Sequence, residues 1–442
     1  MARIAPLRAL YYNPKKIRDL SKVVTPPYDV ISREEQEKLY RKSPYSFIRL
    51  DLSSEPDSYA SAADLFRAWQ GEGVFVQDET PAIYLLSHRF SLKGGPKRER
   101  RGFFALLELQ DFTEGDIRPH EKTLSAPKED RLRLMLATHA QLSPVFALYA
   151  DPKQSINRML GEVAEGIPPL LEFVADEADE CRLWRVDDPG LVREIGHAMA
   201  AHRLLIADGH HRYEAALQYR DRMRAERGNW TGREPFNYVL VYCANINDEN
   251  LIILPTHRLV RGFTPQPFLQ LEETLQKYFY LEPYPKTPDG RAWFLKALKG
   301  GKKQRLIGAT FKRDPRYLIL RLKNKRIMQR LAKDLSAPLR ELDVSVLHRL
   351  VLEHILGLSS DQQARGQTID YSQDEEAVLQ AVEKEDYQAA FILNPPKAEE
   401  IVAVADSGET MPQKSTYFYP KVPSGLVINK VDSAEEIDSI AI

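Results

Sequence analysis

The chain has 442 residues, which is too long for a single hydrophobic core, because single cores stop growing near about 250–300 residues. We therefore expect two or three globular units. Hydrophobic residues make up 43% and charged residues 28%, which is typical of a folded protein and excludes a disordered chain. The 62 Lys and Arg residues are balanced by 63 Asp and Glu residues, so the net charge gives no overall field that would attract DNA or an anionic membrane.

The sequence contains two cysteines, Cys181 and Cys243, which excludes a disulfide framework and a multi-thiolate metal site. Its first residues lack the continuous apolar core of a signal peptide, and no apolar stretch approaches the roughly 20 residues needed to span a bilayer. We therefore expect a cytoplasmic protein whose partners are small molecules, without nucleic acid or membrane among them.

The first part of the chain alternates helical and strand patterns. The run Thr25-Pro26-Pro27-Tyr28-Asp29 predicts a stiff extended loop, in which Asp29 caps the following helix. Apolar periodicity and turn residues then predict, in chain order, helices near 33–42 and 57–72, a hairpin of strands 82–92 and 101–112 with its tip at 93–96, a helix over 127–140, a strand over 145–149, a helix over 189–201 and a strand over 204–207.

The pattern continues with a helix from Tyr213 to Arg227, for which Gly228 is the C-terminal cap, and with a second hairpin over 236–246 and 251–260. The proline-rich segment 264–288 predicts a boundary between an N-terminal α/β region, 1–263, and a C-terminal α/β region, 264–442. Beyond it we expect strands near 305–311, 316–322 and 389–394 and helices near 340–356, 373–384 and 397–405. The predicted fold class is α/β, with mixed sheets and hairpins.

The sharpest chemical signal is Asp208-Gly209-His210-His211-Arg212, where a strand is predicted to end and a helix to begin. Such a turn presents unpaired backbone N–H groups and the positive end of the helix dipole to an anion. Gly209 would let the backbone approach a phosphate, Arg212 offers a fork of donors, and the two histidines add donors or proton-transfer capacity. Asp208 could cap the helix or bind Mg²⁺. The alternative is a capped helix whose histidines satisfy buried polar groups.

The run from Leu204 to Ala216, Leu-Leu-Ile-Ala-Asp-Gly-His-His-Arg-Tyr-Glu-Ala-Ala, resembles the nucleotide-binding motif of the ParB and sulfiredoxin superfamily, particularly its free-serine kinase branch. This resemblance implies a ParB/sulfiredoxin-like nucleotide-binding core in which residues 209–212 hold the phosphates. It does not imply sulfinic-acid reduction, because His210 and His211 stand where that chemistry needs a cysteine. It does not imply DNA partition either, because no helix-turn-helix is evident.

The whole chain also resembles a bacterial and archaeal family labelled as a domain of unknown function. That resemblance is carried by four segments: Val24 to Asp29, Pro119 to Thr123, Asp208 to Arg212 and Met411 to Tyr417. It indicates membership of the family and says little about activity.

Two of these segments could complete a phosphoryl-transfer site. In His120-Glu121-Lys122-Thr123, Glu121 is the candidate base that takes the acceptor proton, and His120 and His211 are further catalytic candidates. The resemblance to serine kinases, in which a glutamate is thought to be the base, favours Glu121 over a merely solvated loop. The side chains of Lys414, Ser415 and Thr416 could bind a phosphate or carboxylate. Alternatively, they form a surface connection whose aromatic residues at 417–419 pack on the core.

These features together predict a phosphotransferase that uses ATP or ADP with Mg²⁺ and acts on a small hydroxyl-bearing metabolite, with free L-serine as the best candidate. Two alternatives stay open. One is a nucleotide-binding regulator without turnover, and the other is a hydrolase that uses the pair His210 and His211.

Overall fold

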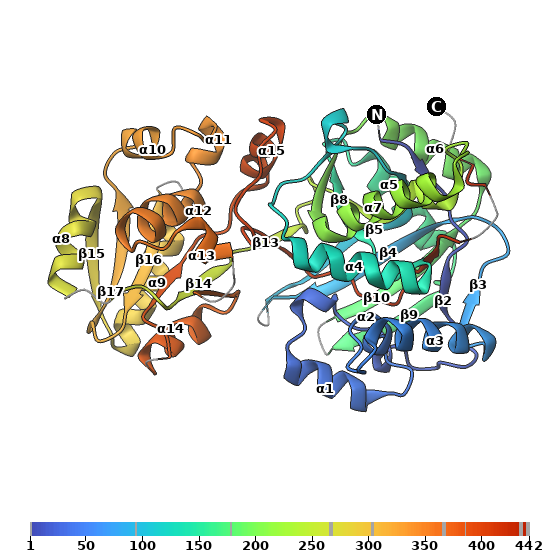
Figure 1. Ribbon diagram of the computed structural model, residues 1–442, viewed down its shortest axis with the longest axis horizontal. Coiled ribbons are helices and arrows are strands. Elements are labelled where there is room, and N and C mark those ends of the chain that lie inside the picture. The colour runs from blue at the N-terminus through green and yellow to red at the C-terminus, as the bar shows by residue number, and fades with distance from the viewer. Residues whose placement is uncertain are drawn as a thin grey trace. The chain divides into compact units, whose positions relative to one another are not determined.

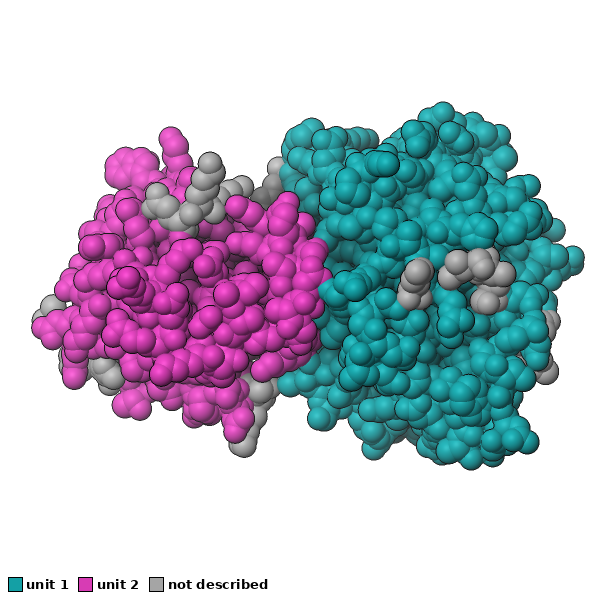
Figure 2. Space-filling view, turned by 90° about the horizontal axis from the view of Figure 1, so that it is seen from above, with its two compact units in different colours: residues 1–119, 123–252, 420–442 teal, residues 120–122, 253–419 magenta. Residues whose placement is uncertain are grey.

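The computed structural model describes residues 2–92, 95–176, 179–264, 268–301, 305–364, 368–384, 386–432 and 436–438. It divides into two compact units (Figures 1 and 2). Unit 1 consists of residues 1–119, 123–252 and 420–442, and unit 2 consists of residues 120–122 and 253–419. This division differs from the predicted regions 1–263 and 264–442, because the chain returns to unit 1 near its C-terminus, where β21 (Asn429–Lys430) pairs with β7 (Ala140–Gln141).

Unit 1 is built on a mixed sheet that has nine strands in the described residues. Its order is β6 (Ile117–Arg118), β11 (Leu204–Asp208), β8 (Val145–Tyr149), β12 (Tyr238–Asn245), β5 (Lys97–Glu108), β4 (Ile83–Ser91), β10 (Asp179–Val186) and β9 (Leu171–Asp176), with β1 (Ile4–Ala5) also paired to β5. The pairs β11–β6 and β12–β8 are parallel and the other pairs are antiparallel. The antiparallel pairing of β4 with β5 confirms the first hairpin, of whose predicted tip residues 93–94 lie outside the described residues.

The second predicted hairpin is wrong. All eight residues of β12 are buried, and both of its edges are occupied, one by β5 and the other by β8. A central strand of this kind has no free edge for its chain neighbours. The following residues instead form β13 (Ile252–Leu254), which pairs with β20 (Tyr417–Tyr419) where the chain enters and leaves unit 2, and β14 (His257–Val260).

Seven α-helices lie in the described part of unit 1 (Figure 1): α1 (Arg33–Lys42), α2 (Ile48–Asp51), α3 (Ser58–Gly71), α4 (Ser125–Thr138), α5 (Ser155–Gly166), α6 (Pro189–Ala200) and α7 (His210–Arg227). Apolar side chains of α5, α6 and α7 pack on the sheet core, and α4 packs on α7. The hydroxyl of Ser32 caps α1 by accepting a hydrogen bond from Glu35 N at 3.2 Å. The expectation that Asp29 is the cap is therefore wrong. Asp29 lies in the short 3₁₀ turn η2 (Tyr28–Val30).

Unit 2 is built on a second sheet, in which all the described pairs are antiparallel. Its order is β15 (Phe279–Pro285), β17 (Arg316–Leu322), β16 (Leu306–Phe311), β19 (Ala389–Ile392), β14 and β18 (Ile369–Ser372). Apolar residues of α9 (Pro288–Gly300) and α14 (Glu375–Glu383) form a core against this sheet. The class predicted from the sequence, α/β with mixed sheets and hairpins, is confirmed. In the part of the chain that the structure describes, no helix is long and apolar enough to cross a membrane.

The other helices of unit 2 are α8 (Phe268–Tyr278), α10 (Arg326–Leu331), α11 (Ala337–Arg340), α12 (Asp343–Ser345), α13 (Ser360–Ala364) and α15 (Ala398–Asp406). The single helix predicted over 340–356 is wrong, because this region forms the short α11 and α12 followed by a π-helix, η5 (Val346–Ile355). A π-helix has wider hydrogen-bonded turns than an α-helix, and such turns are often found near functional sites.

Candidate functional site

The predicted turn between strand and helix lies where β11 ends at Asp208 and α7 begins at His210. Gly209 joins them with a φ of 83°, a left-handed conformation that residues with a side chain rarely adopt. The N-cap residue of α7 is Gly209, which has no side chain with which to cap the helix. The first N–H groups of an α-helix have no partner within the helix, and here they lie at the positive end of an 18-residue helix, an arrangement that favours an anion.

The carboxylate of Asp208 pairs with two cationic side chains and does not cap α7, whose N-cap residue is Gly209. Its Oδ1 accepts a hydrogen bond from Lys421 Nζ at 2.8 Å, and its Oδ2 accepts one from Arg212 Nη2 at 2.7 Å. Burial alone would raise the pKa of this carboxyl, but Lys421 and Arg212 outweigh burial and hold the pKa well below its usual range. The alternative in which Asp208 caps the helix is therefore wrong.

The donor set does not fit a magnesium ion held by protein ligands. Both Asp208 oxygens already bind Lys421 and Arg212, so a metal ion would have to displace one of them. No cluster of three or more His, Cys, Asp or Glu side chains that could hold a metal occurs in the described residues. The carboxylate of Asp208 thus serves the two ion pairs with Lys421 and Arg212.

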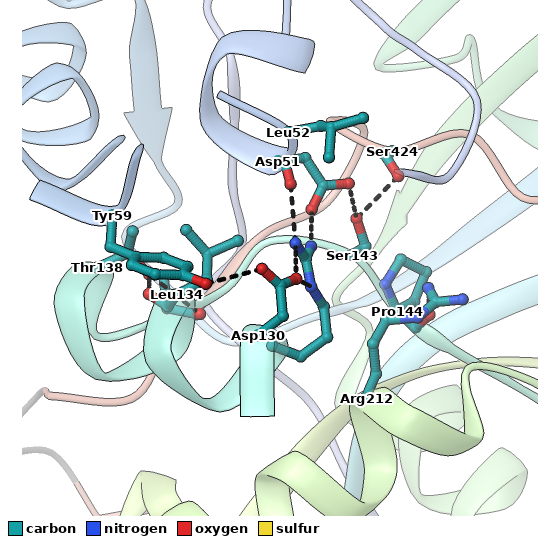
Figure 3. A network of polar contacts seen from close by, with 12 residues as sticks. Asp51, Leu52, Tyr59, Asp130, Leu134, Thr138, Ser143, Pro144, Arg212 and Ser424 are labelled. Atoms are coloured by element: carbon teal, nitrogen blue, oxygen red, sulfur yellow. Dashed lines mark hydrogen bonds and ion pairs between the residues drawn. The ribbon is translucent and has the colours of Figure 1, made fainter. Parts of the chain in front are cut away.

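Arg212 is held in one orientation. Its Nη1 donates a hydrogen bond to the carbonyl oxygen of Pro144 (Figure 3). Its Nη2 donates a hydrogen bond to Asp208. The side chain lies against Gly209, where an added Cβ atom would be only 2.8 Å from Arg212 Nε. Gly209 thus makes room for the guanidinium at the start of α7, and a phosphate arriving there would meet a cation that is already positioned.

His211 anchors the segment that follows the predicted catalytic loop. Its Nε2 accepts a hydrogen bond from Leu124 N at 3.0 Å, which requires that this nitrogen carry no proton. Burial lowers the pKa of His211 below its ordinary value, so the ring is neutral near pH 7 and its Nδ1 is the donor. Glu214, one turn further along α7, accepts a hydrogen bond from Thr123 Oγ1 at 2.8 Å and pairs with Lys128 at 2.7 Å. His210 is buried in the same first turn.

A polar network lies beside this turn and was not predicted from the sequence (Figure 3). Arg131 of α4 binds Asp51 Oδ1 at 2.7 Å, and its guanidinium lies 3.9 Å from the ring centroid of Tyr28. Asp51 Oδ2 accepts a hydrogen bond from Ser143 at 3.1 Å, and the hydroxyls of Ser143 and Ser424 are 2.8 Å apart. The network borders a cavity of about 40 Å³, whose lining includes Asp51, Arg131, Gln141, Ser143, Arg212 and Val239.

In unit 2, the predicted catalytic loop meets the segment 414–416. Glu121 Oε2 accepts a hydrogen bond from Lys414 N at 2.9 Å, and Oε1 accepts hydrogen bonds from Ser415 N at 3.0 Å and from Thr416 N and Oγ1, each at 2.9 Å. His120 Nε2 lies 2.8 Å from Thr416 Oγ1. We call these five residues the Glu121 cluster. Three backbone N–H groups of residues 414–416 and the hydroxyl of Thr416 thus donate to the Glu121 carboxylate.

The structure therefore distributes the predicted site residues over the two units. Unit 1 holds Asp208 to Arg212 and Thr123, and unit 2 holds the Glu121 cluster. A buried arginine that the sequence did not single out adjoins this cluster. Arg258 Nη2 donates to Lys414 O at 3.1 Å, and its guanidinium lies 5.4 Å from the centroid of the Tyr371 ring. No local signal could have identified Arg258, since its partner is 156 residues away in sequence.

The comparisons with known proteins give one family and several distant structures. The family model described as "Protein of unknown function (DUF1015)" matches residues 4–345. A search of the curated proteins found no significant match. Three of the similar solved structures are a conserved hypothetical protein from Pyrococcus furiosus (TM-score 0.34, 15% identity, 71% of this chain and 91% of that chain), free serine kinase in complex with AMP (0.35, 13%, 72% and 88%) and C-terminally truncated SbnI from Staphylococcus aureus (0.34, 14%, 73% and 88%).

Proposed function

This chain belongs to the DUF1015 family, and we propose that it is a nucleotide-dependent phosphotransferase that acts on a small hydroxyl-bearing metabolite, with free L-serine as the best candidate. The observation that carries the proposal is the start of α7 directly behind Gly209, a left-handed glycine in the N-cap position. Backbone N–H groups at a helix N-terminus, with a glycine that admits a close ligand, are a recurrent phosphate-binding arrangement. The donor would be ATP or ADP.

The cations beside the turn support a phosphate ligand. Arg212 and Lys421 are both oriented by Asp208, so these cations are already positioned before a ligand binds. His210 and His211 stand in the first turn of α7, and the neutral His211 ring would act as a hydrogen-bond donor through Nδ1. The reaction would be phosphoryl transfer to the acceptor hydroxyl, assisted by a general base that takes the hydroxyl proton. Glu121 is the candidate base, with His120 and Lys414 as neighbouring candidates.

A second candidate, a nucleotide-binding regulator without turnover, is favoured by the state of Glu121. Four hydrogen bonds from residues 414–416 occupy its two oxygens, and donors of this kind stabilise the ionised carboxylate and so weaken it as a base. A catalytic Glu121 would have to release at least one of these donors before taking a proton. The two candidates share the α7 turn and differ only in turnover.

The test is a binding and turnover panel on the full chain. ATP, ADP and CTP would be titrated with Mg²⁺ by calorimetry, with and without L-serine, and phosphorylated product would be followed by mass spectrometry. In Gly209→Ala, the new methyl group would press on Arg212 in a strained backbone, so we expect nucleotide affinity to fall at least about tenfold.

The matched control is Gly228→Ala at the other end of α7. Gly228 has a similar φ of 73°, but an added Cβ there would meet no atom within 4 Å, so this variant carries the backbone strain without touching the turn. Nucleotide binding with serine-dependent product supports the kinase, and binding without product supports the regulator. Equal nucleotide affinity in the two glycine variants, or no binding by the wild type, would refute the phosphate assignment.

A further inference from the structure

A second cavity, of about 150 Å³, lies within unit 2 at one end of its sheet. It is bordered by residues just before β14 and β16, by the segment 393–397 that follows β19, and by the start of α12. Since roughly 10–15 Å³ of such volume holds one water, the cavity has room for on the order of ten non-hydrogen atoms. That is the size of a small metabolite.

One wall of the cavity carries a buried hydroxyl without a partner. Thr256 is 1% exposed, and its Oγ1 makes no hydrogen bond in the described structure. A buried polar group that is left unpaired costs about 1–3 kcal/mol, so such groups in native proteins are usually satisfied by a ligand or by water. A ligand hydroxyl, amine or carboxylate in the cavity would satisfy Thr256.

The cavity lining also carries both signs of charge. Arg305 Nη1 lies 3.1 Å from Glu400 Oε1 but 3.7 Å from Asp343 Oδ1, and Asp343 Oδ1 makes no hydrogen bond in the described structure. Lys397 contributes a second, exposed cation immediately before α15. Asp343 is thus a mostly buried carboxylate whose nearest cation among the described residues, Arg305, is shared with Glu400 and lies too far from Oδ1 for a hydrogen bond.

We propose that this cavity binds a small zwitterion of the α-amino acid class, whose ammonium group meets Asp343, whose carboxylate meets Lys397 and Arg305, and whose polar atoms satisfy the Thr256 hydroxyl. A purely anionic ligand would face Asp343 and Glu400, and a purely cationic one would face Arg305 and Lys397. A molecule that carries both charges matches both sets. This inference concerns unit 2 alone and does not depend on the phosphate turn of unit 1.

The binding test uses the full chain without nucleotide, so a failure of the proposed kinase function would leave its outcome unaffected. L-Serine, L-alanine and L-threonine would be titrated by ligand-observed NMR, together with two single-charge analogues of serine. Glycerate keeps the carboxylate and hydroxyl without the ammonium group, and ethanolamine keeps the ammonium group and hydroxyl without the carboxylate. We expect at least one amino acid to bind with a dissociation constant of about 1 mM or tighter, and each analogue to bind at least about tenfold more weakly.

Three variants assign the cavity. Lys397→Gln and Asp343→Asn should each weaken amino-acid binding at least about fivefold, and Thr256→Val, which keeps the side-chain shape, should weaken it less. The control is Lys299→Gln on α9, which removes a cation that pairs with Glu375 at 2.6 Å and does not line the cavity. Because Lys397 is exposed, its variant keeps the test valid even if Asp343→Asn does not fold.

Amino-acid binding that is lost in Lys397→Gln and retained in Lys299→Gln would support the proposal. Three outcomes would overturn it: no binding of any amino acid at about 10 mM, binding of glycerate or ethanolamine as tight as that of the amino acids, or binding that persists unchanged in both Lys397→Gln and Asp343→Asn.

Discussion

Unit 1 and unit 2 each bury an aspartate beside a segment that we assign to a ligand, but the two carboxylates have opposite surroundings. Asp208 of unit 1 binds two cations at 2.7 and 2.8 Å, and the cavity that Arg212 borders measures only about 40 Å³. Asp343 of unit 2 has its nearest cation in the described part of the chain, Arg305, at 3.7 Å and lines a cavity of about 150 Å³. Pairing lowers the pKa of Asp208, whereas burial raises the pKa of Asp343 to about 7.

The difference separates two uses of a buried charge. The Asp208 carboxylate is fully paired by groups of the chain itself, so it positions Arg212 and Lys421 whether or not a ligand is present. The Asp343 carboxylate lacks such pairing, and a cationic ligand group would supply it. The first is a scaffold for a site, and the second is part of a binding surface.

The largest expected effect comes from breaking the scaffold of unit 1. Asp208→Asn leaves Lys421 and Arg212 without their shared counter-charge, and removing one member of a buried ion pair typically costs about 3–5 kcal/mol of unfolding free energy. We expect a loss of that size in denaturant titrations at neutral pH. The control is Glu226→Gln, which breaks an exposed pair with Arg222 on the same helix and should cost less than about 0.5 kcal/mol.

The pH dependence of this effect has a definite sign. Because the pKa of Asp208 is lowered in the folded chain, its contribution to stability is present above the ordinary value of 3.8 and is lost only as the pH falls through the lower folded value. The wild type should therefore keep its advantage over Asp208→Asn down to about pH 4. A cost no larger than that of the Glu226 control would contradict the scaffold role.

Asp343→Asn should have the opposite sign. Burial raises the folded pKa of Asp343 to about 7, against an ordinary value of 3.8. Arg305, just before β16, faces this carboxyl and opposes the rise. Arg305 also pairs with Glu400 on α15 and with Glu341. Between these two pKa values the folded chain binds the extra proton, so the stability of the wild type falls as the pH rises through this window. We therefore expect the unfolding free energy of Asp343→Asn, relative to that of the wild type, to rise by about 2–4 kcal/mol from about pH 4 to pH 8.

Hydrogen exchange in peptides that cover β16 and β19 would locate this pH effect in unit 2. A stability difference between Asp343→Asn and the wild type that does not change with pH would mean that the Asp343 carboxyl titrates normally. The contrast between the two buried aspartates would then be lost.

Features set by neighbouring residues were predictable from the sequence. The helix over 33–42 and the strand before Asp208 follow from apolar periodicity and turn residues, and the structure has them as α1 and β11. Features set by distant contacts were not. The hydrogen bond from Lys414 N to Glu121 spans 293 residues, and β12 looked like half of a hairpin because its local pattern cannot reveal that β5 and β8 occupy both its edges. The turn at Gly209 could be predicted from the local run of residues 208–212, whereas Lys421, the distant partner of Asp208, could not.

The smallest expected effect concerns the Glu121 cluster, and it separates the two roles open to this residue. In Glu121→Gln, the amide NH₂ group would face backbone N–H donors of residues 414–416, so at least one of their hydrogen bonds would be lost. We expect the unfolding free energy of unit 2 to fall by about 1–3 kcal/mol, measured against Glu282→Gln, which changes an exposed carboxylate that pairs with Arg321 and accepts a hydrogen bond from Tyr284. A merely structural Glu121 predicts that any phosphotransferase activity falls only in proportion to the folded fraction.

Thr416→Val completes the comparison, because it removes one donor to Glu121 Oε1 and leaves the carboxylate in place. A catalytic base would survive this change, and it would be freed of one hydrogen bond that weakens it, so turnover should persist or rise in Thr416→Val and vanish in Glu121→Gln. A structural tether predicts instead that the two variants differ only in stability, with turnover per folded molecule unchanged in both. Equal turnover per folded molecule in the wild type and Glu121→Gln would remove Glu121 from the chemistry and leave it as the residue that holds the segment 414–416.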